Sequence, residues 1–180
     1  MKIGALAVFC GSKKGNNPLY TQQAAGLGRI LAEKNIMLIY GGGKVGIMGA
    51  LADAVMKNGG RAIGVIPHRL VEWEHQHDRL TELMVVEDMH TRKKRMYELC
   101  DAGLILPGGF GTLDEFFEML TWNQLAIHNK PIFILNTAGF FNHLVLHMEQ
   151  LEKEGFLYET IKERVVLIAS PEKILDYIEY

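Results

Sequence analysis

A glycine-rich turn that leads into a helix carries the residues best suited to chemistry. The apolar run Leu104 to Leu106 ends at a proline, Gly108, Gly109 and Gly111 follow, and Glu115 lies soon after them. Glycines let the backbone turn sharply and approach a ligand closely, and the free N–H groups of a helix N-terminus favour phosphate. Because holding a phosphate requires no carboxylate, the presence of Glu115 beside this turn indicates catalysis.

A second glycine turn follows an earlier apolar run. Gly41-x-Gly43-x-x-Gly46 matches the dinucleotide-binding fingerprint by letter, but it follows the second predicted strand, and the next strand lacks the expected acidic residue. Arg69 stands near that position and would suit a 2′-phosphate, so an NADP-linked enzyme is one alternative; glycines that only form turns are another. Two such turns at the carboxyl edge of a parallel sheet favour one phosphorylated ligand between them.

A basic run in a predicted helix divides into an inward and an outward part. Arg92 shares a helical face with the apolar Met89, whereas Lys94 pairs with Glu98 at the i, i+4 spacing of a surface. Arg92 should therefore point inward, where a guanidinium needs an anionic partner. An internal salt bridge is one interpretation, and a bound phosphate or Glu115 is the other.

Other patterns supply competing interpretations or exclude classes of enzyme. Thr112-x-x-Glu115 matches a capping box, in which Glu115 would only satisfy a helix N-terminus. The seven histidines lack diagnostic metal spacing, so no metal site is expected. No Gly-x-Ser-x-Gly elbow or Walker lysine occurs, which argues against a serine hydrolase and a P-loop kinase.

Composition describes an ordinary globular chain. The 180 residues are 48% hydrophobic and 22% charged, which predicts one domain over residues 1–180. A net charge of −2 argues against nucleic-acid binding, and no apolar run reaches the ~20 residues of a membrane span. Cys10 and Cys100 lie in apolar context and are expected to be buried thiols, so we expect a cytoplasmic protein without a disulfide.

Apolar strand patterns alternate with helical patterns from end to end, which predicts a doubly wound, Rossmann-like α/β fold. About seven parallel strands would carry helices on both faces. The predicted strands are Ile3–Cys10, Ile36–Tyr40, Arg61–Ile66, Leu83–Val86, Gly103–Leu106, Pro131–Leu135 and Val165–Ile168. The predicted helices begin near Asn17–Pro18 and then cover Ile47–Lys57, Met89–Cys100, Thr112–His128, Phe140–Glu154 and Pro171–Tyr180, with Pro67–Arg79 irregular.

Several of these motifs together resemble the Lonely Guy family. Pro107–Glu115 resembles the family signature PGGxGTxxE, and Met89–Lys93 resembles its MHxRK element. Gly41–Gly49 is similar to the family's glycine loop, and Thr121–Leu125 fits as well. The resemblance spans most of the chain, and the first two motifs are far more specific together than either glycine loop alone.

The resemblance implies a cytokinin riboside 5′-monophosphate phosphoribohydrolase, which cleaves AMP or N6-modified AMP into free base and ribose 5-phosphate. It implies catalytic roles for Glu115 and Arg92 without a cofactor or metal. The substrate-binding residues would be Lys93, Met89, Gly108, Gly109, Gly111, Thr112, Gly42 and Gly43. Such proteins are often labelled lysine decarboxylases, but that chemistry needs pyridoxal phosphate on a Schiff-base lysine, and no lysine here has a context that indicates one.

Three functions are therefore to be separated: the nucleotide N-glycosidase, an NADP-linked oxidoreductase that uses Arg69, and a non-catalytic nucleotide-binding protein on the same fold. A homodimer is expected, partly from the resemblance. The segment Phe116–Ile127 also carries apolar residues more than halfway round its predicted helix, more than one buried face accounts for.

Overall fold

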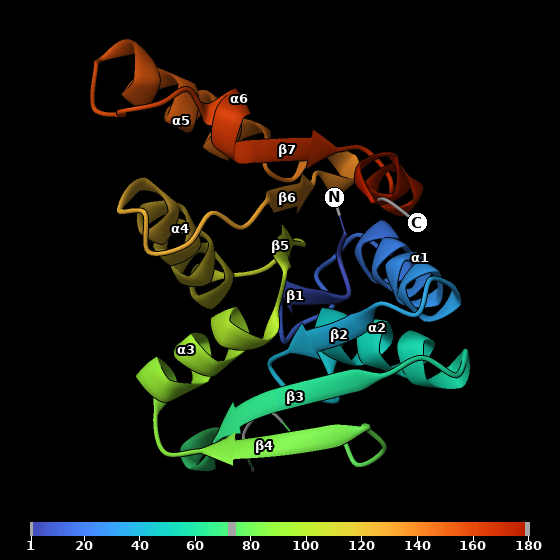
Figure 1. The fold of residues 1–180 in the computed structure, drawn as a ribbon. Coiled ribbons are helices and arrows are strands. Elements are labelled where there is room, and N and C mark those ends of the chain that lie inside the picture. The colour runs from blue at the N-terminus through green and yellow to red at the C-terminus, as the bar shows by residue number, and fades with distance from the viewer. Residues whose placement is uncertain (1, 72–74, 179–180) are drawn as a thin grey trace.

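The computed structural model describes residues 2–71 and 75–178, built on one sheet of seven parallel strands (Figure 1). The strand order is β4-β3-β2-β1-β5-β6-β7, and all six pairings are parallel. The strands are β1 (Ala5–Phe9), β2 (Met37–Tyr40), β3 (Ala62–Pro67), β4 (Glu82–Val86), β5 (Ala102–Ile105), β6 (Ile132–Leu135) and β7 (Val165–Ile168).

Helices cover both faces of this sheet, which confirms the doubly wound prediction. The first two helices and the last 3₁₀ helix share one core, and three later helices share the other (Figure 1). The α-helices are α1 (Leu19–Glu33), α2 (Gly46–Lys57), α3 (Met89–Leu99), α4 (Phe110–Gln124), α5 (Asn142–Lys153) and α6 (Ile161–Arg164). The 3₁₀ helices are η1 (His68–Leu70), η2 (Thr137–Gly139) and η3 (Pro171–Tyr177).

The central strand β1 shows how the sequence feeds both cores. Leu6 and Val8 belong to the core under α1 and α2, whereas Ala7 and Phe9 belong to the core under α3 and α4. Successive side chains of a strand point to opposite faces, so a continuous apolar run is what a strand with two covered faces requires.

The sheet order places a crevice beside β1. β1 pairs with β2 on one side and with β5 on the other. The chain therefore builds outward from β1 toward β4, then crosses back to β5 and builds the other half. In open α/β sheets, ligands bind outside the carboxyl ends of the strands at such a switch point. The loops after β1 and β5 consequently flank the expected binding crevice.

Several predicted boundaries of helices were wrong, and the start of α4 changes how the functional site is interpreted. α4 begins at Phe110 with Gly109 as its N-cap, not at Thr112, and ends at Gln124. The short helix α6 was missed, although Thr160 and Glu163 form a capping box there. The predicted last helix is the 3₁₀ helix η3, and residues 179–180 lie outside the described part of the chain.

The segment predicted as irregular, 67–79, holds the end of β3, η1 and an isolated bridge between Gly43 and Gln76; its residues 72–74 lie outside the described part. Among residues 2–71 and 75–178, no helix combines the length and apolar character needed to span a bilayer. Cys10 and Cys100 are both buried thiols, as expected.

Candidate functional site

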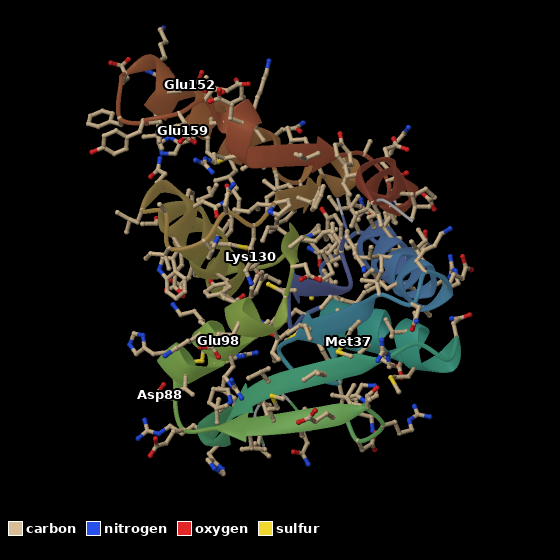
Figure 2. The ribbon with its side chains drawn as sticks, in the orientation of Figure 1. Met37, Asp88, Glu98, Lys130, Glu152 and Glu159 are labelled. Carbon is tan, nitrogen blue, oxygen red and sulfur yellow. The ribbon has the colours of Figure 1, made fainter. Side chains whose placement is uncertain are left out.

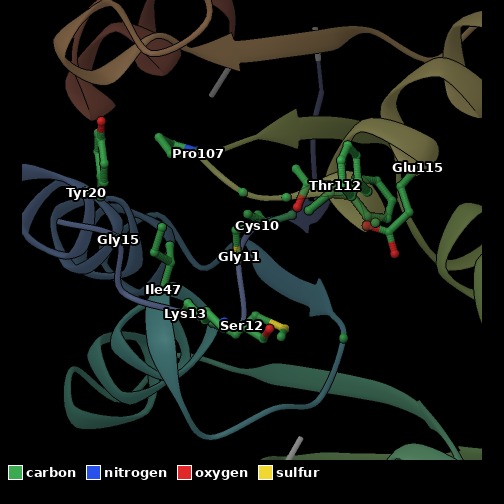
Figure 3. A pocket seen from close by; sticks show the side chains of 18 of the residues that line it. Cys10, Gly11, Ser12, Lys13, Gly15, Tyr20, Ile47, Pro107, Thr112 and Glu115 are labelled. Atoms are coloured by element: carbon green, nitrogen blue, oxygen red, sulfur yellow. The ribbon is translucent and has the colours of Figure 1, made fainter. Parts of the chain in front are cut away.

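A pocket of about 520 Å³ lies at the switch point, where the loops after β1, β2 and β5 meet (Figure 3). The loops after β1 and β5 contribute Cys10, Gly11, Ser12, Lys13, Gly15 and Pro107, Gly108, Gly109. The loop after β2 adds Gly41, α3 adds Met89, Arg92 and Met96, and α4 adds Phe110, Gly111, Thr112 and Glu115. Seven predicted site residues therefore share one pocket, namely Glu115, Arg92, Met89, Gly108, Gly109, Gly111 and Thr112.

The turn from β5 into α4 forms one wall. A Cβ on Gly108 would lie 2.1 Å from Oγ1 of Thr112 and 2.9 Å from the amide of Gly11, so this position must lack a side chain. A Cβ on Gly109 or Gly111 would meet nothing within 4 Å. The first N–H groups of α4 have no acceptor inside the helix and carry its positive dipole end. Backbone donors at an open glycine corner can bind an anion.

The loop after β1 forms the facing wall, and none of its residues is among the predicted site residues. The amide of Gly11 donates to the carbonyl of Pro107 at 3.0 Å, which joins this loop to the β5 turn. Lys13 brings a positive charge to the same pocket. The available signal was Gly11 directly after the first strand, but its partner loop becomes evident only once β1 and β5 are known to be neighbours.

The second glycine turn reaches the pocket through its first glycine. Gly41 lines the pocket, but Gly42 and Gly43 do not. Two amides in the first turn of α2, those of Ile47 and Met48, donate to the carbonyl of Gly11 at 3.1 and 3.3 Å. The helix N-terminus that a dinucleotide fingerprint would offer to a pyrophosphate is thus used to hold the β1 loop.

Arg92 points inward, as its helical face predicted, and is only 5% exposed. Its Nη2 donates to the carbonyl of Gly41 at 3.0 Å, and Nη1 lies 3.7 Å from Sδ of Met89. A Cβ on Gly41 would lie 2.1 Å from Nη2, so a glycine there is what lets the guanidinium reach the loop. Arg92 therefore connects α3 to the turn after β2 at the edge of the pocket.

Helix α3, which follows the labelled Asp88 in Figure 2, is held at both ends, and this fixes the place of Arg92. At its start, the carboxylate of Asp88 accepts from the amide of Thr91 at 2.7 Å. Near its end, the ammonium of Lys130 donates to the carbonyls of Tyr97 and Cys100. Both contacts also complement the helix dipole, with an anion at the N-terminus and a cation at the C-terminus.

Lys93 was predicted to bind substrate, and the structure places it elsewhere. It does not line the pocket. It is 7% exposed, and its Nζ lies 2.6 Å from Oε2 of Glu118 and 3.2 Å from Oδ2 of Asp114 on α4. Adjacent helical residues project about 100° apart, so Lys93 faces α4 where Arg92 faces the pocket. Lys94 is exposed and pairs with Glu98 at 4.0 Å, as predicted.

Glu115 lies in the second turn of α4 and lines the pocket beside Thr112 (Figure 3). The N-cap of α4 is Gly109, so Thr112 already lies inside the helix. Thr112 and Glu115 therefore do not form a capping box, which requires Thr112 at the N-cap position. The capping interpretation is therefore wrong. The backbone carbonyl of Glu115 accepts from the hydroxyl of Tyr97 at 3.1 Å, which attaches this turn of α4 to α3.

Apolar residues line the rest of the pocket, with Tyr20 and Phe140 in an edge-on ring contact of 5.6 Å between centroids. Phe110 stands at the mouth, 92% exposed. Arg69 is exposed and does not line this pocket, so the NADP alternative loses its proposed 2′-phosphate contact. Within residues 2–71 and 75–178, no three histidine, cysteine or carboxylate side chains gather as metal ligands would.

Comparison with known proteins gives one family and one fold. A family model described as possible lysine decarboxylase matches residues 48–178. The cytokinin riboside 5′-monophosphate phosphoribohydrolase of Rhodococcoides fascians is 45% identical over 91% of this chain and 83% of its own. Cytokinin riboside 5′-monophosphate phosphoribohydrolase LOG1 of Arabidopsis thaliana is 40% identical over 99% of this chain and 84% of its own.

Solved structures with the same fold include molybdenum cofactor proteins. That from Rippkaea orientalis superposes with a TM-score of 0.73 at 22% identity, covering 98% of this chain and 96% of the other. The molybdenum cofactor carrier protein of Chlamydomonas reinhardtii gives a TM-score of 0.74 at 19% identity over 98% and 96%. At these identities the likeness shows the shared fold alone.

Proposed function

This chain belongs to the Lonely Guy family of cytokinin riboside 5′-monophosphate phosphoribohydrolases, and we propose that it hydrolyses the N-glycosidic bond of AMP or N6-modified AMP. The products are the free base and ribose 5-phosphate. The observation that carries the proposal is the joint presence of Glu115, Arg92 and the open glycine corner in one pocket. The sequence relation points to the substrate class, and this pocket offers a place for each of its parts.

The 5′-phosphate is assigned to the corner between Gly108 and Thr112. The first amides of α4 point out of the helix N-terminus, and together with the helix dipole they favour an anion there. Lys13, on the facing loop, adds a positive charge on a flexible four-carbon stem. With the phosphate held at this corner, the ribose extends along α4 toward Glu115, which lies in the next turn of the same helix.

Glu115 is assigned the chemical role. Cleavage of a glycosidic bond passes through a cationic, oxocarbenium-like sugar, which a carboxylate can stabilise while it activates the attacking water. Arg92 orients that carboxylate or holds the nucleotide, and its own position is set by Gly41. The leaving base is a nitrogen heterocycle, so the bond broken is C–N and the bond formed is C–O from water.

A lysine decarboxylase is not supported. Schiff-base chemistry requires a lysine whose pKa is lowered so that the amine is neutral. Burial lowers the pKa of Lys93, but hydrogen bonds and charges from Glu118 and Asp114 outweigh it, so the pKa ends above its usual value. Lys93 is therefore held as an ammonium between two carboxylates, and it lies outside the pocket.

Incubation of the purified protein with AMP tests the proposed function directly. We expect adenine and ribose 5-phosphate in equal amounts, measured by chromatography of the base and an assay of the sugar phosphate. Adenosine, which lacks the phosphate, is the matched control and should be a much poorer substrate. Recovery of intact AMP and intact N6-prenyl AMP after long incubation would refute the proposal.

Gly109→Val should weaken AMP binding by at least about tenfold, or ~1.4 kcal/mol, because its side chain occupies the space beside the phosphate corner. The fold should tolerate it, since a Cβ at Gly109 meets nothing within 4 Å and φ is −96°. Calorimetry with AMP measures the change. Gly4→Val, before β1 at the other end of the strand, is the control and should bind normally. A folded Gly109→Val protein with unchanged affinity would move the phosphate elsewhere.

The assembly is proposed to be a homodimer. The segment from α4 into the following turn leaves Phe117 37% exposed, Leu125 66% and Ile127 60%, an apolar surface that favours burial against a second chain. Light scattering at micromolar concentration should give twice the 20.3 kDa of one chain. Leu125→Asp combined with Ile127→Asp should return the mass toward one chain, and a wild-type monomer would contradict this proposal.

A further inference from the structure

Two helices carry the proposed reacting side chains, and a buried ammonium lies between them. Arg92 is on α3 and Glu115 is on α4. The next residue on α3, Lys93, is 7% exposed and contacts Glu118 at 2.6 Å and Asp114 at 3.2 Å. A buried charge is costly unless it is paired and hydrogen-bonded, and the two carboxylates of α4 supply both.

A second contact joins the same helices one turn further along α3. The hydroxyl of Tyr97 donates to the backbone carbonyl of Glu115 at 3.1 Å. Burial, followed by the charges of Glu118 and Glu115, raises the pKa of Tyr97, so the hydroxyl keeps its proton and remains a donor. Lys93 and Tyr97 therefore hold the segment Asp114–Glu118 of α4 at two points.

These contacts lie next to the proposed reacting groups in the chain. Lys93 follows Arg92, and Asp114 precedes Glu115. A shift of α4 relative to α3 that broke the ion pairs would also change the separation of the guanidinium and the carboxylate. Displacements of about 1 Å at a reacting group can cost about 100-fold in rate, so the relative placement of these helices matters for turnover.

A direct role for Lys93 in binding substrate fits the geometry less well. To reach a phosphate, its ammonium would have to leave two carboxylates that satisfy it in a buried place. It does not line the pocket, whereas Lys13 does and is exposed. Lys93 is therefore buried and paired, as a structural ammonium is, whereas Lys13 is exposed at the pocket, where a ligand can reach it.

We propose that Lys93 is a positioning residue, which with Glu118 and Asp114 sets the spacing between Arg92 and Glu115 and makes no contact with substrate. The proposal rests on the proposed function, because it concerns the same reaction. Its distinguishing consequence is that a partner of Lys93 outside the pocket, Glu118, should matter for turnover as much as Lys93 does.

The test compares three variants in AMP hydrolysis and in equilibrium binding of ribose 5-phosphate. Lys93→Met removes the ammonium and keeps much of the side-chain length, and Glu118→Gln removes its closest anion. Lys94→Met is the matched control, because the side chain of Lys94 is 71% exposed and its ammonium lies 4.0 Å from the carboxylate of Glu98. Circular dichroism and thermal melting establish that each variant is folded.

Lys93→Met and Glu118→Gln should each lower kcat by about tenfold or more, with KM for AMP and affinity for ribose 5-phosphate within about twofold of wild type. Lys94→Met should match wild type. If Lys93→Met fails to fold, Glu118→Gln carries the test alone, since its amide keeps the shape of the carboxylate.

Two results would overturn the positioning role while leaving the proposed function intact. One is a raised KM and weakened ribose 5-phosphate binding in Lys93→Met at unchanged kcat, which is the behaviour of a phosphate ligand. The other is wild-type turnover in Glu118→Gln. Failure of the wild-type protein to hydrolyse AMP would instead refute the proposed function, and with it the reaction that Lys93 is proposed to serve.

Discussion

Glu115→Gln should lower kcat for AMP by about 100-fold or more, the scale of a positioned acid–base group, while leaving AMP affinity close to wild type. The amide keeps the shape of the side chain but can neither accept the proton of the attacking water nor stabilise a cationic sugar with its charge. Binding should survive because the phosphate is assigned to the backbone of the Gly108–Thr112 corner, which the substitution does not touch. Steady-state kinetics and calorimetry measure the two effects separately.

The fold should also survive Glu115→Gln. The contact that attaches this turn of α4 to α3 uses the backbone carbonyl of Glu115 and the hydroxyl of Tyr97, not the carboxylate. Glu115 is also no part of the N-terminal cap, because α4 begins at Phe110. Asp114→Asn is an informative neighbour, since Asp114 is 61% exposed and is the more distant partner of Lys93; it should reduce turnover far less. A Glu115→Gln enzyme that releases adenine at the wild-type rate would leave the reaction without its proposed carboxylate.

Local patterns predicted the elements well because each has a short-range cause. A short apolar run such as Leu104–Leu106, ended by a proline and glycines, is typical of a buried strand in a parallel sheet with two covered faces. The inward direction of Arg92 followed from helical spacing alone, and the structure confirms it at 5% exposure. Gly108 lies in the predicted turn, because a short connection between a buried strand and a helix N-terminus favours glycine.

The sequence could not predict which loops lie next to each other in the folded chain. The strand order puts β1 beside β5, and only this order brings Gly11 and Lys13 across from Pro107. Sequence reasoning instead paired the β5 turn with the turn after β2, where Gly41 lines the pocket but Gly42 and Gly43 do not. The similarity of the two glycine turns is real, but the amides after the second are used to hold the carbonyl of Gly11.

The location of Lys93 away from the pocket lining has a similar cause. A one-residue step along a helix turns the side chain by about 100°, and whether that direction meets substrate or protein depends on what packs against it. Here α4 packs there and presents Asp114 and Glu118. Arg92 and Lys93 are therefore neighbours in the sequence motif, but Arg92 lies at the pocket and Lys93 lies between α3 and α4.

Arg92→Ala should lower kcat/KM for AMP by about 100-fold, because it removes the cation that faces the pocket beside Glu115. It should also cost about 1–3 kcal/mol of folding stability, since the buried carbonyl of Gly41 loses its donor at 3.0 Å. Arg95→Ala is the matched control on the same helix: Arg95 is 50% exposed and pairs with a surface carboxylate, Glu98, at 2.9 Å, so activity should be unchanged.

Two further variants separate lost charge from lost position. Arg92→Lys keeps a cation but not the planar fork that spans Gly41 and the pocket, so it should restore only part of the activity. Gly41→Ala does not change Arg92 itself, but it puts a Cβ 2.1 Å from Nη2 of Arg92 and must therefore displace the guanidinium. We expect kcat to fall although no reacting group has been changed. Wild-type kcat in a folded Gly41→Ala enzyme would show that the position of this guanidinium does not affect turnover. Wild-type kcat/KM in Arg92→Ala would show that Arg92 has no role in the reaction.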